Sequence, residues 1–189
     1  MASIVYKKSY KAPPIDKMEA LRYAGVRGSD RMAEAILDEC IDLSAMRLSY
    51  KLAYRILDKT ELPKSVTESS TGAGFLGESR SAILVMASIG MELDRLIARY
   101  ERISSPHALM LSALGSERVE ALVDLFEEDI SSEVGELGRR FSPGYGDIPL
   151  SAQTELFRLI EPHRYIGLSL SESLLMSPSK SVSAIIPIK

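Results

Sequence analysis

Two histidines and one cysteine are the side chains of this sequence best suited to nucleophilic, acid–base or metal chemistry. His107 and His163 lie in different contexts, one at the expected start of a helix and one after the expected end of another. A metal site would need further ligands beside them, and a hydrolase would need a G-x-S-x-G turn, which is absent. Cys40 alone forms no intrachain disulfide, and its helical surroundings predict a small buried residue. We therefore expect no metal site and no catalytic residues.

A glycine pattern at residues 72–77, Gly-Ala-Gly-Phe-Leu-Gly, matches the phosphate-binding loop of dinucleotide-binding proteins. Such a loop follows a hydrophobic strand and opens a helix. Here a polar stretch, residues 65–71, comes before it, and the strand-like apolar run comes after it, at residues 82–87. The order is wrong for a nucleotide site, so we interpret the segment as a flexible loop.

The loop at residues 139–147, Arg-Arg-Phe-Ser-Pro-Gly-Tyr-Gly-Asp, has the composition of a binding loop. Its Pro-Gly pair predicts a type II turn with Gly144 at positive φ, and Gly144 and Gly146 leave the backbone uncovered. Arg140 is suited to holding a carboxylate with two hydrogen bonds, and Tyr145 offers a ring face. These groups suit a ligand with a carboxylate and an aromatic base or a cation. The same pattern also fits a plain helix stop and tight turn with a solvated arginine.

Apolar periodicity and capping residues predict an α+β domain in which helices alternate with separated strands. We expect helices at 18–23, from the Ser29-Asp30 cap to about 46, and at 91–103, about 106–137 and 151–160. We expect strands at 48–56, with one solvated edge or face, and at 82–88, fully buried. Two closing strands are expected within 166–188, at 166–176 and 181–188. The long helix should end at Gly138, with a bend near Gly115.

One side of the long predicted helix is acidic. Eight acidic side chains between residues 117 and 136 lie outside its apolar stripe, with Arg118 as the only basic residue in that stretch. We expect this side to face solvent and to attract a cationic ligand or a docking partner.

Composition adds mainly exclusions. The chain has 189 residues, 46% hydrophobic and 26% charged, with 23 Lys and Arg against 26 Asp and Glu. This balance gives no electrostatic reason to expect nucleic acid, and the longest apolar run is far too short to cross a membrane. The start has no signal-peptide pattern, so we expect a cytoplasmic globular protein.

Several segments together resemble the activation domain of cobalamin-dependent methionine synthase. The stretch 140–147 resembles its Arg-x-x-x-Gly-Tyr motif, and 170–184 resembles its Leu-Thr-Glu-Ser…Met-x-Pro…Ser-Val-Ser segment at similar spacing. Residues 115–124 resemble its long-helix segment, while 21–28 and 87–96 are similar to small stand-alone relatives. The resemblance covers most of the chain. It implies a single module over residues 1–189, with a twisted, mostly antiparallel sheet and flanking helices.

The resemblance also implies a ligand, S-adenosylmethionine, and a set of contacts. Arg140 would hold the ligand's carboxylate, while Ser142 and Gly144 would supply backbone contacts and Tyr145 would pack on the ligand. The long-helix glutamate in register with the family is Glu120, which would face the ligand's amino group or sulfonium. From the residues alone, Glu120 is one more charge on a solvated face.

The sequence departs from the family in ways that restrict its role. It lacks the Asp-x-His-x-x-Gly signature of the cobalamin module, and Glu161-Pro-His163 is only a near match. We find no counterpart of an early acidic ligand contact or of a tyrosine-bearing segment expected after Ser183. Cobalamin would therefore come only through a partner protein.

Three functional hypotheses follow. In the leading one, the chain binds S-adenosylmethionine and reactivates a separate corrinoid-dependent methyltransferase, or a methionine synthase lacking its own activation domain. A reductant such as flavodoxin or ferredoxin would supply the electron. In the second, the chain is a non-catalytic adaptor that docks on a corrinoid protein without S-adenosylmethionine. The third, an independent methyltransferase, would need a general base near the methyl group, and none stands out.

Overall fold

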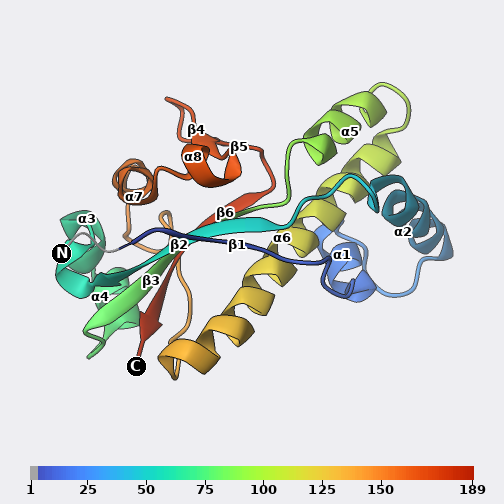
Figure 1. Ribbon diagram of the computed structural model, residues 1–189. Coiled ribbons are helices and arrows are strands. Elements are labelled where there is room, and N and C mark those ends of the chain that lie inside the picture. The colour runs from blue at the N-terminus through green and yellow to red at the C-terminus, as the bar shows by residue number, and fades with distance from the viewer. Residues whose placement is uncertain (1–3) are drawn as a thin grey trace.

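A four-stranded antiparallel sheet with the strand order β1-β2-β3-β6 forms the centre of the molecule. The structure is a computed structural model and describes residues 4–189. The strands are β1 (Tyr6–Ser9), β2 (Lys51–Asp58), β3 (Ser81–Ser88) and β6 (Ser181–Ile188). A short hairpin, β4 (Ser169–Leu170) with β5 (Met176–Ser177), stands apart from this sheet (Figure 1).

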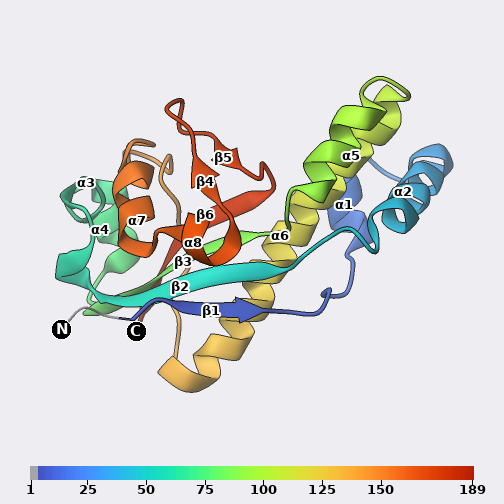
Figure 2. The same cartoon turned by 45° about the horizontal axis from the view of Figure 1, so that its top comes forward.

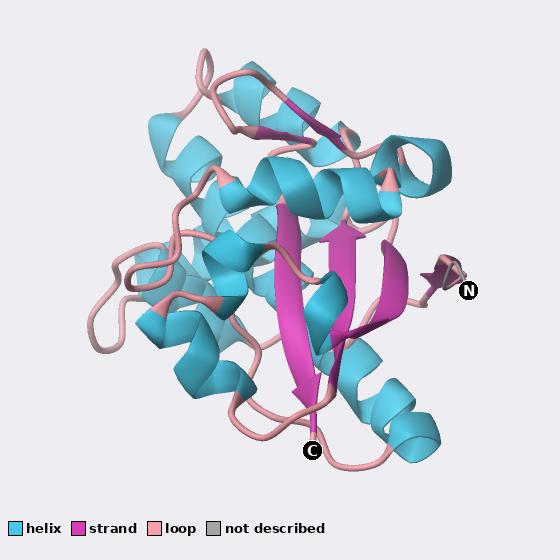
Figure 3. Cartoon of the chain, turned by 90° about the vertical axis from the view of Figure 1, so that its left-hand side faces the viewer, coloured by secondary structure: helices cyan, strands magenta, loops and turns pink. Residues whose placement is uncertain are grey.

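Helices cover both faces of the sheet, as Figure 3 shows. One group consists of α1 (Lys17–Tyr23), α2 (Arg31–Ser44), α5 (Glu92–Tyr100) and the long helix α6 (Ser105–Val134). The other consists of α3 (Lys64–Thr67), α4 (Ser70–Leu76), α7 (Ala152–Ile160) and α8 (Pro162–Ile166). A 3-10 turn, η1 (Lys59–Glu61), follows β2.

Alternation along the strands creates two hydrophobic cores. In β3, Ile83 and Val85 belong to the core beneath α6, whereas Leu84 and Met86 belong to the core beneath α7 and α8. Because both faces of β3 are covered, its whole apolar run is buried, as predicted for residues 82–88. The predicted α+β fold, an antiparallel sheet with flanking helices, is therefore confirmed.

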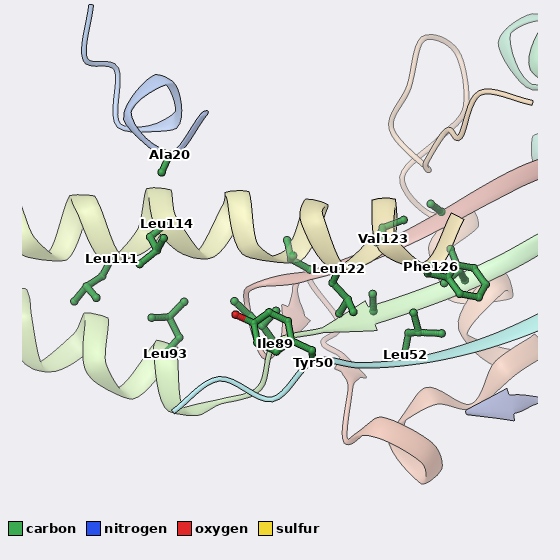
Figure 4. Close-up of a cluster of buried hydrophobic side chains, with 14 of the residues drawn as sticks. Ala20, Tyr50, Leu52, Ile89, Leu93, Leu111, Leu114, Leu122, Val123 and Phe126 are labelled. Carbon is green, nitrogen blue, oxygen red and sulfur yellow. The ribbon is translucent and has the colours of Figure 1, made fainter. Parts of the chain in front are cut away.

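Helix α6 connects two parts of the core that lies beneath it, which we call the first core; the core beneath α7 and α8 is the second core. Near its start, Leu111 and Leu114 face Leu93 of α5, and farther along Leu122 and Phe126 face the sheet (Figure 4). Figures 1 and 2 show α1, α2 and α5 gathered around the first half of this helix. The long helix thus reaches from the helical end of the molecule to the sheet.

Four expectations about the elements need correction. The 72–77 segment is not a flexible loop, because its first five residues belong to α4, where Ser69 caps the helix. The strand predicted at 48–56 is β2, and it has no solvated face because helices cover both sides. The long helix ends at Val134, with Gly135 rather than Gly138 as its cap. The segment 166–176 holds the end of α8 and most of a hairpin, where one strand was expected.

Candidate functional site

The loop at residues 139–147 is held in place by the edge of the sheet. Residues Leu137 and Phe141 form isolated bridges with Ile188 and Ile185 of β6. Phe141 is 1% exposed and belongs to the second core, so the residue after Arg140 is an anchor. The backbone around Arg140 therefore runs beside β6, and the turn that follows has a fixed starting point.

The turn at residues 142–145 has the predicted type II form. The Tyr145 N–H donates to the Ser142 carbonyl at 3.1 Å, and Gly144 has φ +91°. The Gly144 N–H donates to the Ile148 carbonyl at 3.0 Å. The Ser142 carbonyl and the Gly144 N–H are thus already used within the loop, and these are the two residues whose backbone the resemblance assigned to the ligand.

Asp147 fastens the far end of this loop to α4. Its carboxylate accepts hydrogen bonds from the Ser70 and Thr71 N–H groups at 2.8 and 2.9 Å. Hydrogen bonds from Thr71 and Ser70 hold the pKa of Asp147 well below its ordinary value. Gly146 is required beside this contact, because a Cβ there would lie 2.1 Å from Thr71 Oγ1. The turn is therefore fixed at both ends.

Arg140 points at three carboxylates of α6. Its guanidinium lies 2.7 Å from Glu120, 2.5 Å from Asp124 and 2.8 Å from Glu127. Burial opposes the charge of Arg140, but hydrogen bonds to Glu127, Asp124 and Glu120 outweigh it and raise its pKa. The spacing of the three acids, one helical turn apart, places them on one side of α6.

A groove of about 560 Å³ lies beside the turn, and we call it the turn groove. It is lined by residues from four separate stretches of the chain: Glu120; Ser142, Pro143 and Tyr145; Leu150 and Gln153; and 174–176, 179 and 181–183. Three exposed apolar side chains form part of its lining, with Tyr145 50%, Leu150 47% and Leu175 69% exposed. An open apolar groove with a few polar groups is typical of a small-molecule site.

The structure brings some of the predicted site residues together. Glu120, Ser142 and Tyr145 line the turn groove, whereas Arg140 and Gly144 do not. Arg140 pairs with Glu120 of the lining, and Gly144 stands between the lining residues Pro143 and Tyr145. Arg140 and Glu120 were predicted as separate ligand contacts, and here they contact each other. Gly144 shapes the turn without lining the groove.

Sequence reasoning missed several groove residues. Gln153 and Ser183 are 4% and 3% exposed and line the groove, yet neither belongs to the predicted set. Ser183 could have been found from its spacing to Ser181, because alternate residues of a strand point to the same face. Asp124 and Glu127 could have been found from their helical spacing to Glu120.

The acidic side of α6 is not the uniformly solvated surface that was predicted. Glu117 is 3% exposed and forms a buried ion pair with Arg118, which is 1% exposed. Arg118 donates to the carbonyls of Pro13 and Pro14, both at 2.6 Å, and Glu117 accepts from the Asp16 N–H at 3.1 Å. This pair fastens the N-terminal segment to α6. Farther along, lysines pair with three more of the acids, namely Lys8 with Asp129 and Glu133, and Lys189 with Glu136.

Cys40 and His107 are held by packing and hydrogen bonds within the fold. Cys40 is fully buried in α2, as predicted, and burial raises the pKa of its thiol to about 11. His107 lies 2.8 Å from the Ser104 hydroxyl and 2.9 Å from Glu39. Within residues 4–189, no cluster of His, Cys, Asp and Glu has the arrangement of a metal site. Over the same residues, no helix combines the length and hydrophobicity needed to cross a membrane.

Comparisons with known proteins match this fold and much of the sequence. Residues 77–188, more than half of the chain, match the family model described as "Vitamin B12 dependent methionine synthase, activation domain". Methionine synthase from Mycobacterium tuberculosis (strain ATCC 25618 / H37Rv) is 34% identical over 107 residues. That match covers 54% of this chain and 8% of the relative, so the chain corresponds to a small part of it.

A solved structure gives a similar fold at low identity. The crystal structure of the MetH reactivation domain bound to AdoHcy superimposes with a TM-score of 0.68 and 16% identity. The superposition covers 97% of this chain and 78% of that one. At this identity the likeness concerns the fold.

Proposed function

Because the chain belongs to the activation-domain family of vitamin B12-dependent methionine synthases, we propose that it binds S-adenosylmethionine in the turn groove. One observation carries the proposal: Glu120, Ser142 and Tyr145, drawn from α6 and the 142–145 turn, line one groove. Its volume of about 560 Å³ falls within the range of small-molecule sites, about 300–1,000 Å³. The solved reactivation domain of similar fold, which is bound to AdoHcy, supports the same ligand class.

Charge at the edge of the groove suits the amino-acid end of such a ligand. Arg140 and Glu120 lie 2.7 Å apart, one positive and one negative, and Glu120 lines the groove. The ligand's carboxylate would pair with Arg140, and its ammonium or sulfonium with Glu120. A zwitterion can therefore insert between two groups that already face each other. Asp124 and Glu127 hold the guanidinium near this position.

The proposed role is that of one activation-type module acting on a corrinoid protein in the cytoplasm. The partner would be a corrinoid-dependent methyltransferase, or a methionine synthase lacking its own activation domain, with a reductant such as flavodoxin or ferredoxin. The corrinoid of the partner supplies the metal chemistry of remethylation when it is bound there. The residues of this chain hold S-adenosylmethionine in one orientation so that its methyl group faces the partner. That task needs no general base from this chain.

Calorimetric titration of the purified chain with S-adenosylmethionine and S-adenosylhomocysteine tests the proposal. We expect saturable binding of both ligands, and competition of each with the other for one site. A titration without heat change at millimolar ligand, repeated with a corrinoid protein present, would contradict the proposal.

A second candidate function is an adaptor that docks on a corrinoid protein without S-adenosylmethionine. The observation that favours it is the state of Arg140, whose guanidinium is already occupied by three carboxylates. Association with a corrinoid protein and no binding of S-adenosylmethionine in the same experiment would identify this function.

A further inference from the structure

Gln153 combines deep burial with an unpaired side-chain amide. It lies in the first turn of α7 and is 4% exposed. Its backbone N–H donates to the Leu150 carbonyl at 3.0 Å, but within residues 4–189 its side chain has no hydrogen-bond partner. An unpaired amide in a closed protein interior costs free energy, so a group of this kind calls for an explanation.

The turn groove provides that explanation. Among the described residues, no buried side-chain nitrogen or oxygen that is closed off from solvent lacks a partner. The Gln153 amide must therefore reach solvent, and the space that it lines is the turn groove. Its amide has one acceptor and two donors, and it presents them to whatever occupies this groove.

Three hydroxyl groups of the same groove are also unpaired. Ser142, Tyr145 and Ser183 line it, and none of their hydroxyls has a hydrogen-bond partner within the part of the chain that is described. The other polar groups of the lining are occupied: Glu120 by Arg140, Ser179 by Asp94 and Ser181 by the Pro178 carbonyl. The free polar groups are therefore one amide and three hydroxyls, set among apolar side chains.

We infer that Gln153 determines specificity by hydrogen bonding to the adenine edge of the adenosyl group. This inference rests on the proposed ligand. An amide and adenine are complementary, because the amide oxygen accepts from the adenine amino group while the amide nitrogen donates to N7. The Tyr145 ring, half exposed on the groove, supplies an apolar face for the base. The hydroxyls of Ser142 and Ser183 remain for the polar groups of the ribose.

The inference predicts discrimination between two bases. In S-inosylhomocysteine the adenine amino group is replaced by a carbonyl oxygen, so both edge positions are acceptors. The Gln153 amide can donate to one of them but must then place its own oxygen against the other. A matched bidentate contact of this kind gives about fivefold to 150-fold discrimination. S-adenosylhomocysteine should therefore bind the wild-type chain more tightly than S-inosylhomocysteine by at least about fivefold.

The test is calorimetric titration of three proteins with both ligands. Gln153→Met keeps the length and volume of the side chain but removes the amide, so the affinity ratio should fall towards one. Thr154→Val is the matched control, because Thr154 is the next residue of α7 and does not line the turn groove. It should keep the wild-type ratio. Because the readout is a ratio within one protein, a general loss of stability does not produce the expected change.

Each outcome has a distinct meaning. If the wild-type chain binds S-adenosylhomocysteine without discrimination, or if Gln153→Met discriminates as well as wild type, the role of Gln153 is refuted and the proposed function stands. If the wild-type chain binds neither ligand, the proposed function fails and the role of Gln153 fails with it.

Discussion

Arg140 lies among more negative charge than one guanidinium neutralises. Three carboxylates contact it, and its side chain is 25% exposed, so the cluster keeps an excess of negative charge partly shielded from water. A ligand that brings its own positive charge to Glu120 reduces this excess, whereas a purely anionic ligand increases the repulsion. The cluster therefore favours zwitterionic or cationic ligands over simple anions.

Replacement of Arg140 tests whether this side chain contacts the ligand or only stabilises the loop. We expect Arg140→Ala to weaken S-adenosylmethionine binding by about 1.5–3 kcal/mol, the cost of losing a hydrogen bond to a charged group. The control is Arg139→Ala, because Arg139 is exposed and lies over the Phe75 ring at 5.9 Å, outside the groove. Calorimetry measures both affinities. Equal affinities for the two variants would show that Arg140 does not contact the ligand.

Elements with strong local signals were predicted well. Asp30 accepts from the Met32 and Ala33 N–H groups and caps α2, as expected from the Ser-Asp pair. Pro106 stands in the first turn of α6, where its missing N–H costs nothing. Such signals depend on a few neighbouring residues, so a sequence reveals them directly.

Elements that depend on distant partners were not predicted. Strand β1 is short and mostly exposed, and it is ordered by its pairing with β2. Helix α4 contains two glycines, which local propensity disfavours, and it is stabilised by Asp147 from the far loop. In both cases the stabilising contact comes from residues far away in the sequence.

Glycines at two helical positions should respond to alanine in opposite directions. A Cβ at Gly115 of α6 would lie 2.4 Å from the Cδ2 atom of Leu93, which is fully buried, and 2.9 Å from the Cγ atom of Lys180. We expect Gly115→Ala to lower the free energy of unfolding by about 1–3 kcal/mol, as overpacking does. A Cβ at Gly74 of α4 meets nothing within 4 Å, so Gly74→Ala should raise it by about 0.4–1 kcal/mol.

Urea denaturation of the two variants and the wild type measures these changes. A stabilising effect of Gly115→Ala would mean that α5 and α6 can move apart at little cost. A loss of stability in Gly74→Ala would mean that the α4 backbone differs from the helical form described.

In the whole molecule, the turn groove is formed only because the sheet, covered on both faces, brings distant segments together. The turn groove combines a residue of α6, the 142–145 turn, the start of α7 and the tail before and within β6. The 142–145 turn itself was predictable from its Pro-Gly pair. The groove, the pairing of Arg140 with Glu120 and the exposure of Gln153 to the groove were not, because they depend on tertiary packing.

Burial in this fold acts in one direction on four tyrosines and the cysteine. Desolvation is the main cause that raises the pKa values of Tyr10, Tyr23, Tyr50, Tyr54 and Cys40 above their ordinary values. Burial lowers the pKa of the Lys180 ammonium, so deprotonation of this one group favours the folded state. Since the folded state holds the protons of five acids more tightly than the unfolded chain does, deprotonation favours unfolding.

This burial predicts a loss of stability in alkaline solution. For Cys40 the contribution is fully present below the ordinary thiol value of 9.0 and is lost as the pH rises towards about 11, the pKa in the folded state. The tyrosines add to the loss in the same direction once the pH passes 10.0, their ordinary value. The free energy of unfolding, measured by urea denaturation, should therefore fall steadily from about pH 9 to about pH 11. Cys40→Ala removes one of these groups, so its stability should fall less steeply over that interval. A flat profile for the wild type would show that these side chains are hydrated in the folded state, contrary to their buried positions.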